Sequence, residues 1–523
     1  MTARPLLLGG AMSVLACACS VQGPRVPTSS EFAAVVARLE RTDPASPALL
    51  SAKLGYADSL LSAAPGPCAE RLVRVQEQLG SVEVDPTTPV MFPDGLARAA
   101  DLEYRLHLAR AACALRAEDA DELRAAAAAA HRAVELYRDV FDYRSMVIMQ
   151  SNASMVLHQL GETAAALSDL QAALQMDREY GFQDDARENY QLLLAWRSEA
   201  SGPAQVARLM QDFPKRRATL RFGWHPANAR ITLESRREYL KDGQPFRSRA
   251  AAAFQLHIGA VPGGGWSVSY TDRLARYEPG VWSTIGSPKA KDSQAPQAVF
   301  PPAPIPPVGF TVSAAGQFQA VTDSEAFAAR LVDRTDLLIR AQAPSGTRAH
   351  GLTNDAVEMT ADVLSPGALE AATAASYALG TAMWIGATLE QGIWYETSAP
   401  LSLPGIPRIV IQHGIAFAFT RMVPCAADAA PPRCIEIVIR VTPDRQALDD
   451  VNANTFSLHY AASIEGRIVT DPATLLPYAR EERIFWYYSF GPNRQHTTLK
   501  SEHLVSSTRY ESNSPVSPSV IKH

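Results

Sequence analysis

The spacing of apolar residues along this chain changes at Phe213-Pro214. Upstream of that point, from about Ser30, apolar residues recur at helical spacing in alanine-rich sequence, which predicts a series of short helices. Downstream, apolar and polar residues alternate, as at Ile231-Thr232-Leu233 and Phe254-Gln255-Leu256, and a period of two predicts strands. Because these runs follow one another through tight turns without alternating helices, we predict an antiparallel sheet.

The predicted fold class is α+β: an N-terminal helical repeat array followed by a large antiparallel β-rich domain with inserted helices. The uncharged run 371–389 reaches membrane-spanning length, but its Ala, Thr, Ser and Gly residues contribute little to insertion, so we predict a buried helix there. The predicted boundaries are 1–16 for a signal peptide, 17–30 for a flexible tether, 31–215 for the helical domain, 216–505 for the β-rich domain with its helical insertion at about 324–389, and 506–523 for a disordered tail.

The helical half repeats itself at an interval of forty residues, because the sequence at 133–138 is similar to that at 173–178. A period of this size indicates helix pairs that bury their apolar faces by stacking on their neighbours. The central copy resembles a tetratricopeptide repeat, with Leu157, Leu160-Gly161, Ala164 and Ala173 at the matching positions. The resemblance implies an array that presents a surface to a protein or peptide partner.

The first residues have the form of an export signal, in which Arg4 precedes an uncharged apolar run that stops at Cys17. The run is too short to span a bilayer, which takes roughly 20 helical residues. Residues 14–17 (Val-Leu-Ala-Cys) resemble the lipobox of bacterial lipoproteins, and the resemblance implies that Cys17 is acylated and becomes the mature N-terminus. Cys19 offers a poorer frame for the same motif, and an ordinary cleaved signal is the alternative.

The lipobox resemblance also implies a location: a lipid-anchored protein of the cell envelope that faces the periplasm. Ala18 follows the modified cysteine in place of the Asp of an inner-membrane retention signal, so we expect the outer membrane. The net charge of −5 argues against a nucleic-acid partner, which would need a clustered basic face to neutralise phosphates.

Export to an oxidising compartment permits disulfides, and the cysteines suggest two of them. Cys425 and Cys434 flank a short loop between two strand-like runs, so we predict a bridged hairpin. Cys68 and Cys113 both lie in helical sequence and could join two neighbouring helices. Two buried free thiols are the alternative for that second pair.

The sequence contains no motif that specifies a catalytic centre, a metal site or a cofactor. It has no paired histidines with zinc spacing, no nucleophile elbow and no phosphate-binding glycine loop. The acidic doublet Glu481-Glu482 reads as solvated surface, because consecutive carboxylates point in different directions. We therefore expect a protein that is not an enzyme and that needs neither a cofactor nor a metal.

Aromatic residues gather in two places, at Trp384 with Trp394 and again around Trp486. Core packing explains such clusters, but a pocket for an apolar ligand lined by Trp384, Trp394 and Trp486 would also use them. A sheet with inserted helices in a periplasmic lipoprotein is similar in layout to the half-open barrel of lipoprotein carriers. The leading hypothesis is a membrane-anchored scaffold that binds proteins through its helical repeats, and the alternative is a carrier or sensor of an apolar or lipid ligand in the β-rich domain.

Overall fold

A computed structural model provides the structure of the chain. The residues that it describes are 28–42, 47–62, 68–84, 93–113, 120–197, 203–211, 213, 216–241, 244–274, 283–284, 308–329, 365–403, 406–426, 432–444, 446–448, 459–490 and 496–511. The predicted signal peptide, Cys17, and the predicted tether up to residue 27 lie outside these residues.

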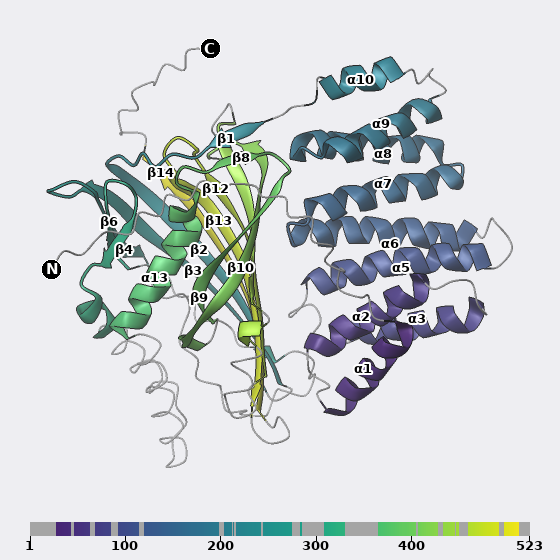
Figure 1. Cartoon of the computed structure of the whole chain (residues 1–523), viewed down its shortest axis with the longest axis horizontal. Helices are drawn as coiled ribbons and strands as arrows, with labels where there is room; N and C mark the ends of the chain where they lie inside the picture. Colours follow the sequence, from purple (N-terminus) through teal and green to yellow (C-terminus); the bar gives the residue numbers. More distant parts are fainter. Residues whose placement is uncertain are drawn as a thin grey trace, which may run out of the picture.

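The N-terminal half forms the expected helical array, in which successive helices pack against one another (Figure 1). Its helices are α1 (Ser29–Thr42), α2 (Pro47–Ser62), α3 (Cys68–Val84), α5 (Pro93–Cys113), α6 (Ala120–Asp139), α7 (Tyr143–Gln159), α8 (Thr163–Tyr180), α9 (Gln183–Trp196) and α10 (Pro203–Gln211). Fully buried alanines such as Ala126, Ala130, Ala133 and Ala153 let α6 and α7 approach closely. Whether the array is a tetratricopeptide domain in the strict sense stays a prediction.

The C-terminal half contains a 12-stranded sheet in which the named strand pairs are all antiparallel, as predicted. Along the main path the order is β7-β6-β4-β3-β2-β14-β13-β12-β11-β10-β9, and β5 pairs with β3. The strands are β2 (Ala227–Lys241), β3 (Gln244–Ala260), β4 (Trp266–Leu274), β5 (Ser283–Thr284), β6 (Phe310–Val312), β7 (Phe318–Val321), β9 (Trp394–Leu403), β10 (Ile406–Val423), β11 (Cys434–Pro443), β12 (His459–Thr470), β13 (Pro477–Phe490) and β14 (His496–Tyr510). A separate two-stranded sheet joins β1 (Arg217–Thr219) to β8 (Thr388–Glu390).

Two turns of this sheet follow directly from glycine. Residues 262–265 join β3 to β4, and the three glycines there all have positive φ. Gly316 lies in the turn between β6 and β7 with φ of 79°, and a Cβ there would meet the ring of Phe222 at 2.7 Å. Only glycine satisfies both the left-handed backbone and the close approach.

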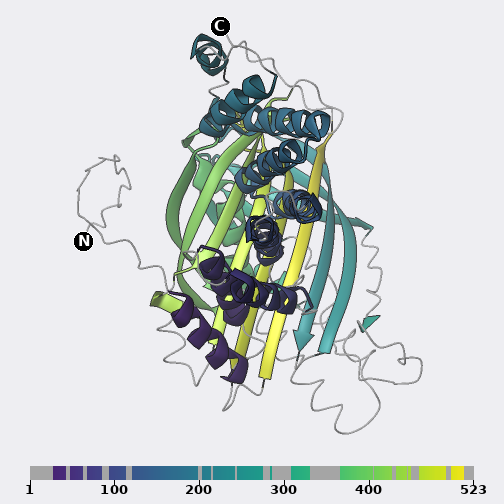
Figure 2. The same cartoon turned by 90° about the vertical axis from the view of Figure 1, so that its right-hand side faces the viewer.

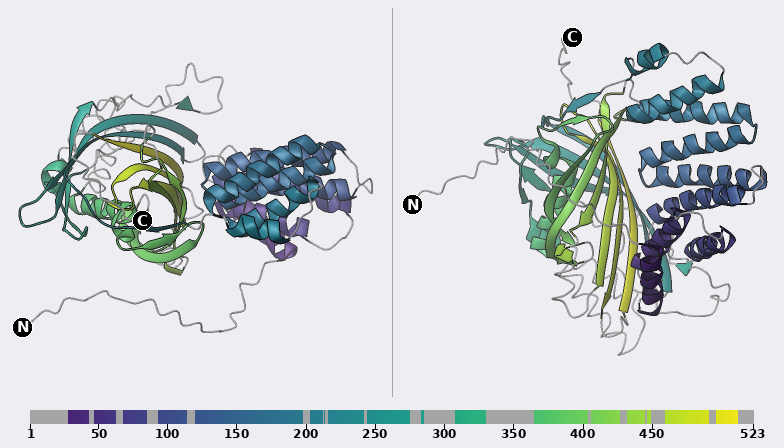
Figure 3. Two further views of the ribbon diagram at one scale, coloured as in Figure 1. Left: turned by 90° about the horizontal axis from the view of Figure 1, so that it is seen from above. Right: turned by 45° about the vertical axis from the view of Figure 1, so that its right-hand side comes forward.

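The sheet is strongly curved, and different elements cover its two faces (Figures 2 and 3). Helix α13 (Pro366–Gly380) and the short 3₁₀ helix Ala382–Trp384 lie on the concave face, whereas the helical array lies on the convex face. Strand β11 shows the consequence in one sequence. Ile435, Ile437 and Ile439 pack into the core of the concave side, while Val438 packs with the helical array.

Three expectations about boundaries were wrong. Strand β14 continues to Tyr510 inside the predicted disordered tail, because residues 506–510 pair with β2 along their whole length. The insertion at 324–389 ends in strand β8, and the uncharged run contributes a shorter helix than predicted, since α13 ends at Gly380. Helix α1 begins at Ser29, inside the predicted tether.

None of the helices in the described part of the chain is both long and apolar enough to cross a bilayer.

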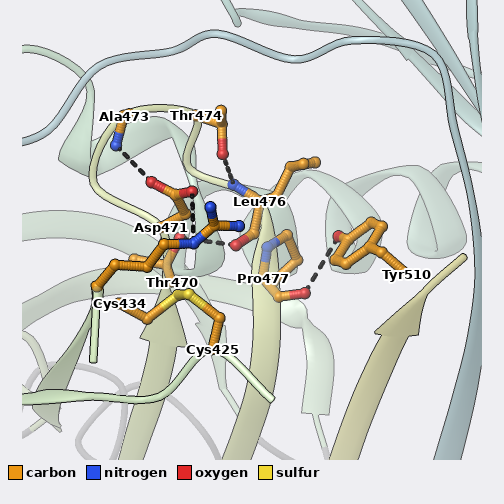
Figure 4. Close-up of a disulfide and its surroundings, with 10 residues drawn as sticks. Cys425, Cys434, Thr470, Asp471, Ala473, Thr474, Leu476, Pro477 and Tyr510 are labelled. Atoms are coloured by element: carbon orange, nitrogen blue, oxygen red, sulfur yellow. Dashed lines mark hydrogen bonds and ion pairs between the residues drawn. A yellow bond between two sulfur atoms is a disulfide. The ribbon is translucent and has the colours of Figure 1, made fainter. Parts of the chain in front are cut away.

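The predicted Cys425–Cys434 disulfide is confirmed, with Cα atoms 5.0 Å apart at the facing ends of β10 and β11 (Figure 4). The turn from β12 to β13 lies beside it. There the Thr470 hydroxyl donates to the Leu476 carbonyl at 3.0 Å, and the Tyr510 hydroxyl donates to the Pro477 carbonyl at 3.1 Å. The disulfide and these bonds lie at one end of five neighbouring strands, β10 to β14.

Candidate functional site

A cavity of about 360 Å³ lies between α13 and the concave face of the sheet. Its walls are mostly apolar. The lining residues are Trp224, Ile231, Leu256, Ile258, Val268, Tyr270, Val308, Phe310, Leu369, Ala372, Thr373, Ser376, Tyr377, Gly380, Thr381, Ile468, Pro477, Ala479, Arg480, Ser506, Thr508 and Tyr510. The volume falls in the range of small-molecule sites, which are commonly 300–1,000 Å³.

The sheet wall of the cavity is produced by strand periodicity. Register places Ile258 beside Val268 and Val268 beside Phe310, so three apolar side chains from β3, β4 and β6 form one row. In the neighbouring row Leu256 lies beside Tyr270. Because every second residue of a strand faces the same side, these rows give one continuous apolar surface.

The helical wall is one face of α13, to which Leu369, Thr373, Ser376, Tyr377 and Gly380 contribute at spacings of three and four residues. Tyr377 fixes the helix, because its hydroxyl donates to the Gly316 carbonyl at 2.8 Å. Its ring also meets Trp224 edge-on at 5.9 Å between ring centroids.

The far end of that helical face is bound to β13 by Arg480. Its guanidinium donates to the Ser376 hydroxyl at 2.8 Å and to the Ser376 carbonyl at 3.2 Å. It also forms an ion pair with Glu482 at 2.5 Å. Its cation therefore lies beside carbonyl oxygens near the C-terminus of α13, where the helix dipole favours positive charge.

Two nitrogen donors among the lining side chains have no acceptor within the described structure: Nε1 of Trp224 and Nε of Arg480. Trp224 is 7% exposed, so water does not compensate its indole N–H. The tyrosines, in contrast, stay neutral at physiological pH. Burial raises the pKa of Tyr270 to about 12, against the smaller effect of Arg480, and burial also raises the pKa of Tyr377 and Tyr510.

The convex face of the sheet has a different chemistry, because it meets the helical array through buried ion pairs. The Glu436 carboxylate is 1% exposed and accepts hydrogen bonds from Thr420 at 2.8 Å, Arg467 at 3.1 Å and Arg421 at 3.3 Å. Arg421 also pairs with Glu179 at the end of α8. The network therefore crosses from the sheet to the array.

The network extends along β13. Arg467 donates to Glu481 at 2.8 Å, and His503 contacts the same carboxylate at 2.8 Å. Burial alone would raise the pKa of Glu481, but the hydrogen bond to His503 and the charge of Arg467 outweigh it and lower the pKa to about 2. The expectation that Glu481 and Glu482 are solvated surface was therefore wrong. Both carboxylates are less than one-fifth exposed and ion-paired, on opposite faces of one strand.

A polar pocket of about 530 Å³ lies where the array meets β8 and the start of β9. Four of its charged lining residues form two ion pairs, Arg144 with Asp185 at 3.1 Å and Arg217 with Glu390. Gly181, which has φ of 84°, lets the array approach here, since a Cβ would meet the Gln391 side chain at 2.9 Å. The pocket lies between the two halves of the molecule, and its basic and acidic lining residues are equal in number.

The structure does not bring the three predicted tryptophans together, and none of them lines the cavity. Trp384 is fully buried in the core beside β10 and β11. Trp486 packs in a separate cluster with Leu403 and Tyr460. Trp394 is 39% exposed on β9, under the guanidinium of Arg440. Trp384 and Trp486 are thus buried in two separate clusters, and Trp394 lies at the surface.

The residues that do form the site gave weak signals in the sequence. Trp224 is a single tryptophan in a segment that precedes β2. Arg480-Glu481-Glu482-Arg483 is a charge run inside a strand that is otherwise aromatic and aliphatic, and its period of two places Arg480 and Glu482 on one face. Reading that run as a strand pattern would have indicated an ion pair on each side of the sheet.

For the other predicted disulfide, Cys113 is disulfide-bonded at the end of α5, whereas the side chain of Cys68 lies outside the described residues. The Cys68–Cys113 pairing therefore stays a prediction. Within the described residues no three His, Cys, Asp or Glu side chains are grouped so that they could hold a metal ion.

Fold and cavity define the chain as an α+β protein in which a helical array covers the outside of a curved antiparallel sheet and one helix covers the inside. No protein-family model matches the chain, and no curated protein matches it in sequence.

Proposed function

We propose that this protein is a lipid-anchored envelope protein that binds an apolar ligand between α13 and the concave face of the sheet. The single observation that carries the proposal is the apolar cavity of about 360 Å³. The pocket is partly open to solvent along α13, where its lining residues Ala372 and Ser376 are exposed, so a ligand can enter it. A partly open, mostly apolar hollow of this size is typical of sites for small molecules.

Two neighbouring residues of α13 provide the test. Both alanines are exposed, but Ala372 lines the pocket and Ala371 does not. We expect A372W to fill the cavity and to weaken binding of the neutral fluorophore N-phenyl-1-naphthylamine at least tenfold, while A371W binds like the wild type. Fluorescence titration of the full chain measures both. Equal affinities of the two variants would show that the fluorophore binds elsewhere, and absence of binding in the wild type would refute the proposed function.

The membrane anchor is the second part of the proposal. It rests on the leader and on the lipobox resemblance at Cys17, and the Cys425–Cys434 disulfide is in keeping with an oxidising compartment. Stable anchoring takes more than one acyl chain, and a lipidated cysteine would supply it. We expect C17S to leave the membrane fraction and to lose the acyl mass of the mature N-terminal peptide. Membrane fractionation and mass spectrometry decide this independently of ligand binding.

A scaffold role for the helical array is the second candidate function. Ile148 and Met155 lie two turns apart on α7 and are 41% and 40% exposed. The ion pairs to the sheet come from helix ends, at Asp142 and Glu179, so this surface of α7 is not used there. If it binds a protein partner, I148S combined with M155S should abolish co-purification of that partner. V73S, on the exposed surface of α3, serves as the matched control.

A further inference from the structure

A carboxyl group is buried inside the helical array where the preceding copy of the repeat has an aromatic ring. Asp177 of α8 lies forty residues after Tyr137 of α6, and Asp177 is 0% exposed while Tyr137 is 5% exposed. Oδ2 of Asp177 accepts a hydrogen bond from the Asn189 amide at 2.7 Å. The side-chain oxygen of Asn189 in turn accepts from the Ser151 hydroxyl at 2.6 Å. Asp177 therefore links α8 to α9 and, through Asn189, to α7.

The main chain of Asp177 also shapes the turn between α8 and α9. Its carbonyl oxygen accepts from the N–H groups of Gly181 and Phe182, at 2.8 and 2.9 Å. The array contacts the sheet at this turn, because the Gln391 side chain lies against Gly181 and its amide donates to the Glu179 carbonyl. Opening of the C-terminal turn of α8 would therefore weaken the contact between the array and the sheet.

Burial makes the ionised form of Asp177 costly. Its Oδ1 has no hydrogen-bond partner within the described structure. A buried carboxylate that accepts one hydrogen bond is poorly compensated for the water it has lost. Burial raises the pKa of Asp177 to about 7, against the smaller effect of the hydrogen bond from Asn189. The carboxyl is therefore partly protonated near neutral pH.

The charged groups around Asp177 do not supply the missing compensation. Arg144 of α7 favours the ionised carboxylate, but it is paired with Asp185 of α9, whose own charge opposes ionisation. Tyrosines at this end of α8 are uncharged, because burial raises their pKa. The other titratable groups near this end of α8 are thus ion-paired or uncharged, namely Glu179 with Arg421, and Tyr143 stacked on Tyr180.

We propose that Asp177 is a proton-dependent switch that controls how firmly the array is attached to the sheet. In its protonated form Asp177 is neutral, and α7, α8 and α9 pack around it without an uncompensated charge. When the proton leaves, the buried charge favours opening of the C-terminal turn of α8, and the contact with Gln391 weakens. The switch lies in the array, on the convex side of the sheet, so it is independent of the ligand pocket under α13 (Figure 1).

The direction of the effect follows from the raised pKa. A carboxyl that binds its proton more tightly in the closed form than in the open form stabilises the closed form at low pH. That contribution is lost as the pH rises from 3.8, the ordinary pKa of an aspartate, to about 7, and it changes little above that. The array should therefore be attached more firmly at pH 5.5 than at pH 7.5.

Hydrogen exchange of the full chain, measured by mass spectrometry, tests the switch at the turn itself. The protection factor of a peptide containing Gly181 and Phe182 is compared at pH 5.5 and 7.5, after correction for the intrinsic exchange rate. We expect protection in the wild type to fall about tenfold between these pH values. D177N, which has no proton to lose, should be equally protected at both. D184N is the matched control, because Asp184 is 83% exposed on α9, and it should behave like the wild type.

Two results would overturn the proposal: wild-type protection that does not change with pH, and D177N protection that changes as much as that of the wild type. N189A keeps the test decisive if D177N disturbs the packing. It removes the hydrogen bond that favours the ionised carboxylate, so the pH above which protection stops falling should move upward. If Asn189 has only a structural role, N189A lowers protection equally at every pH, and the switch is refuted.

Discussion

The two faces of the same sheet use opposite means to hold what covers them. On the concave face, Ile435, Ile437 and Ile439 of β11 pack into an apolar core, and the neighbouring region leaves a cavity under α13. On the convex face, Arg440 of the same strand pairs with Asp142 of the helical array. Glu436 pairs with Arg421 of β10, which in turn pairs with Glu179 of the array. Inter-domain contacts are commonly more polar than domain cores. The comparison teaches that the concave side is the interior of a domain and the convex side is a junction.

The largest effect should come from breaking the junction at Glu436. E436A removes a carboxylate that is 1% exposed and accepts three hydrogen bonds, two of them from the partly exposed Arg421 and Arg467, and we expect a loss of about 3–4 kcal/mol in the free energy of unfolding. Urea denaturation followed by circular dichroism measures it, and the array and the sheet should then unfold in separate transitions. The control is E135A, whose carboxylate is 67% exposed on α6 and should cost under about 0.5 kcal/mol. A similar cost for both variants would contradict the comparison.

Two isoleucines on the concave side allow the packed core to be compared with the wall of the pocket. Ile437 is fully buried in solid core, so I437A should cost about 3 kcal/mol. Ile258 is 2% exposed and forms part of the pocket wall, so I258A enlarges an existing hollow and should cost about 2 kcal/mol or less. Thermal denaturation of the ligand-free chain compares them. If I258A is the more destabilising, the void is not present in solution.

The Cys425–Cys434 disulfide lies at the ends of β10 and β11, two strands whose side chains contribute to both the concave and the convex face of the sheet. Replacing Cys425 and Cys434 by alanine opens a loop with a sequence separation of 9, and the entropic estimate of the loss is about 2.5 kcal/mol. Because β10 and β11 serve both sides, fluorophore binding and docking of the array should weaken together. The measurement is denaturation with and without a reductant, which should destabilise the wild type more than the double variant, because only the disulfide at Cys113 remains in the variant. Equal effects of the reductant on both would contradict the prediction.

The smallest expected effect is on the stability of the fold at low pH. The pKa of Glu481 is lowered to about 2 in the folded chain, so its ionised form stabilises the fold above its ordinary value near 4.5. That contribution is lost as the pH falls from about 4.5 to 2, and solvent screening limits it to about 1 kcal/mol. E481Q should flatten this limb of the stability curve. Fluorophore binding should stay constant over the upper part of this range, because the lining tyrosines are neutral throughout, and a parallel loss would contradict the separation of the two faces.

Much of the architecture could be predicted from local pattern. The period of two in β11, the glycine turn at 262–265 and the alanine-rich helices each specify a local conformation, so the α+β class and the antiparallel sheet were correct. The Cys425–Cys434 pair was correct for the same reason, since its two strands are joined by one short loop. The candidate site was not predictable in this way, because Trp224, Tyr377 and Arg480 are separated by more than 100 residues each and meet only through the sheet and α13.

The sequence by itself determined which residues alternate, where the chain turns and which segments are helical, since those depend on neighbours within a few positions. The tertiary structure alone decided which face of each strand is concave, that β2 pairs with β14 across more than 250 residues, and that tryptophans of equal hydrophobicity end up in separate clusters. The physical reason is that burial free energy depends on area removed from water and not on which partner removes it. A linear pattern therefore specifies that a side chain is buried, and only the completed sheet specifies against what.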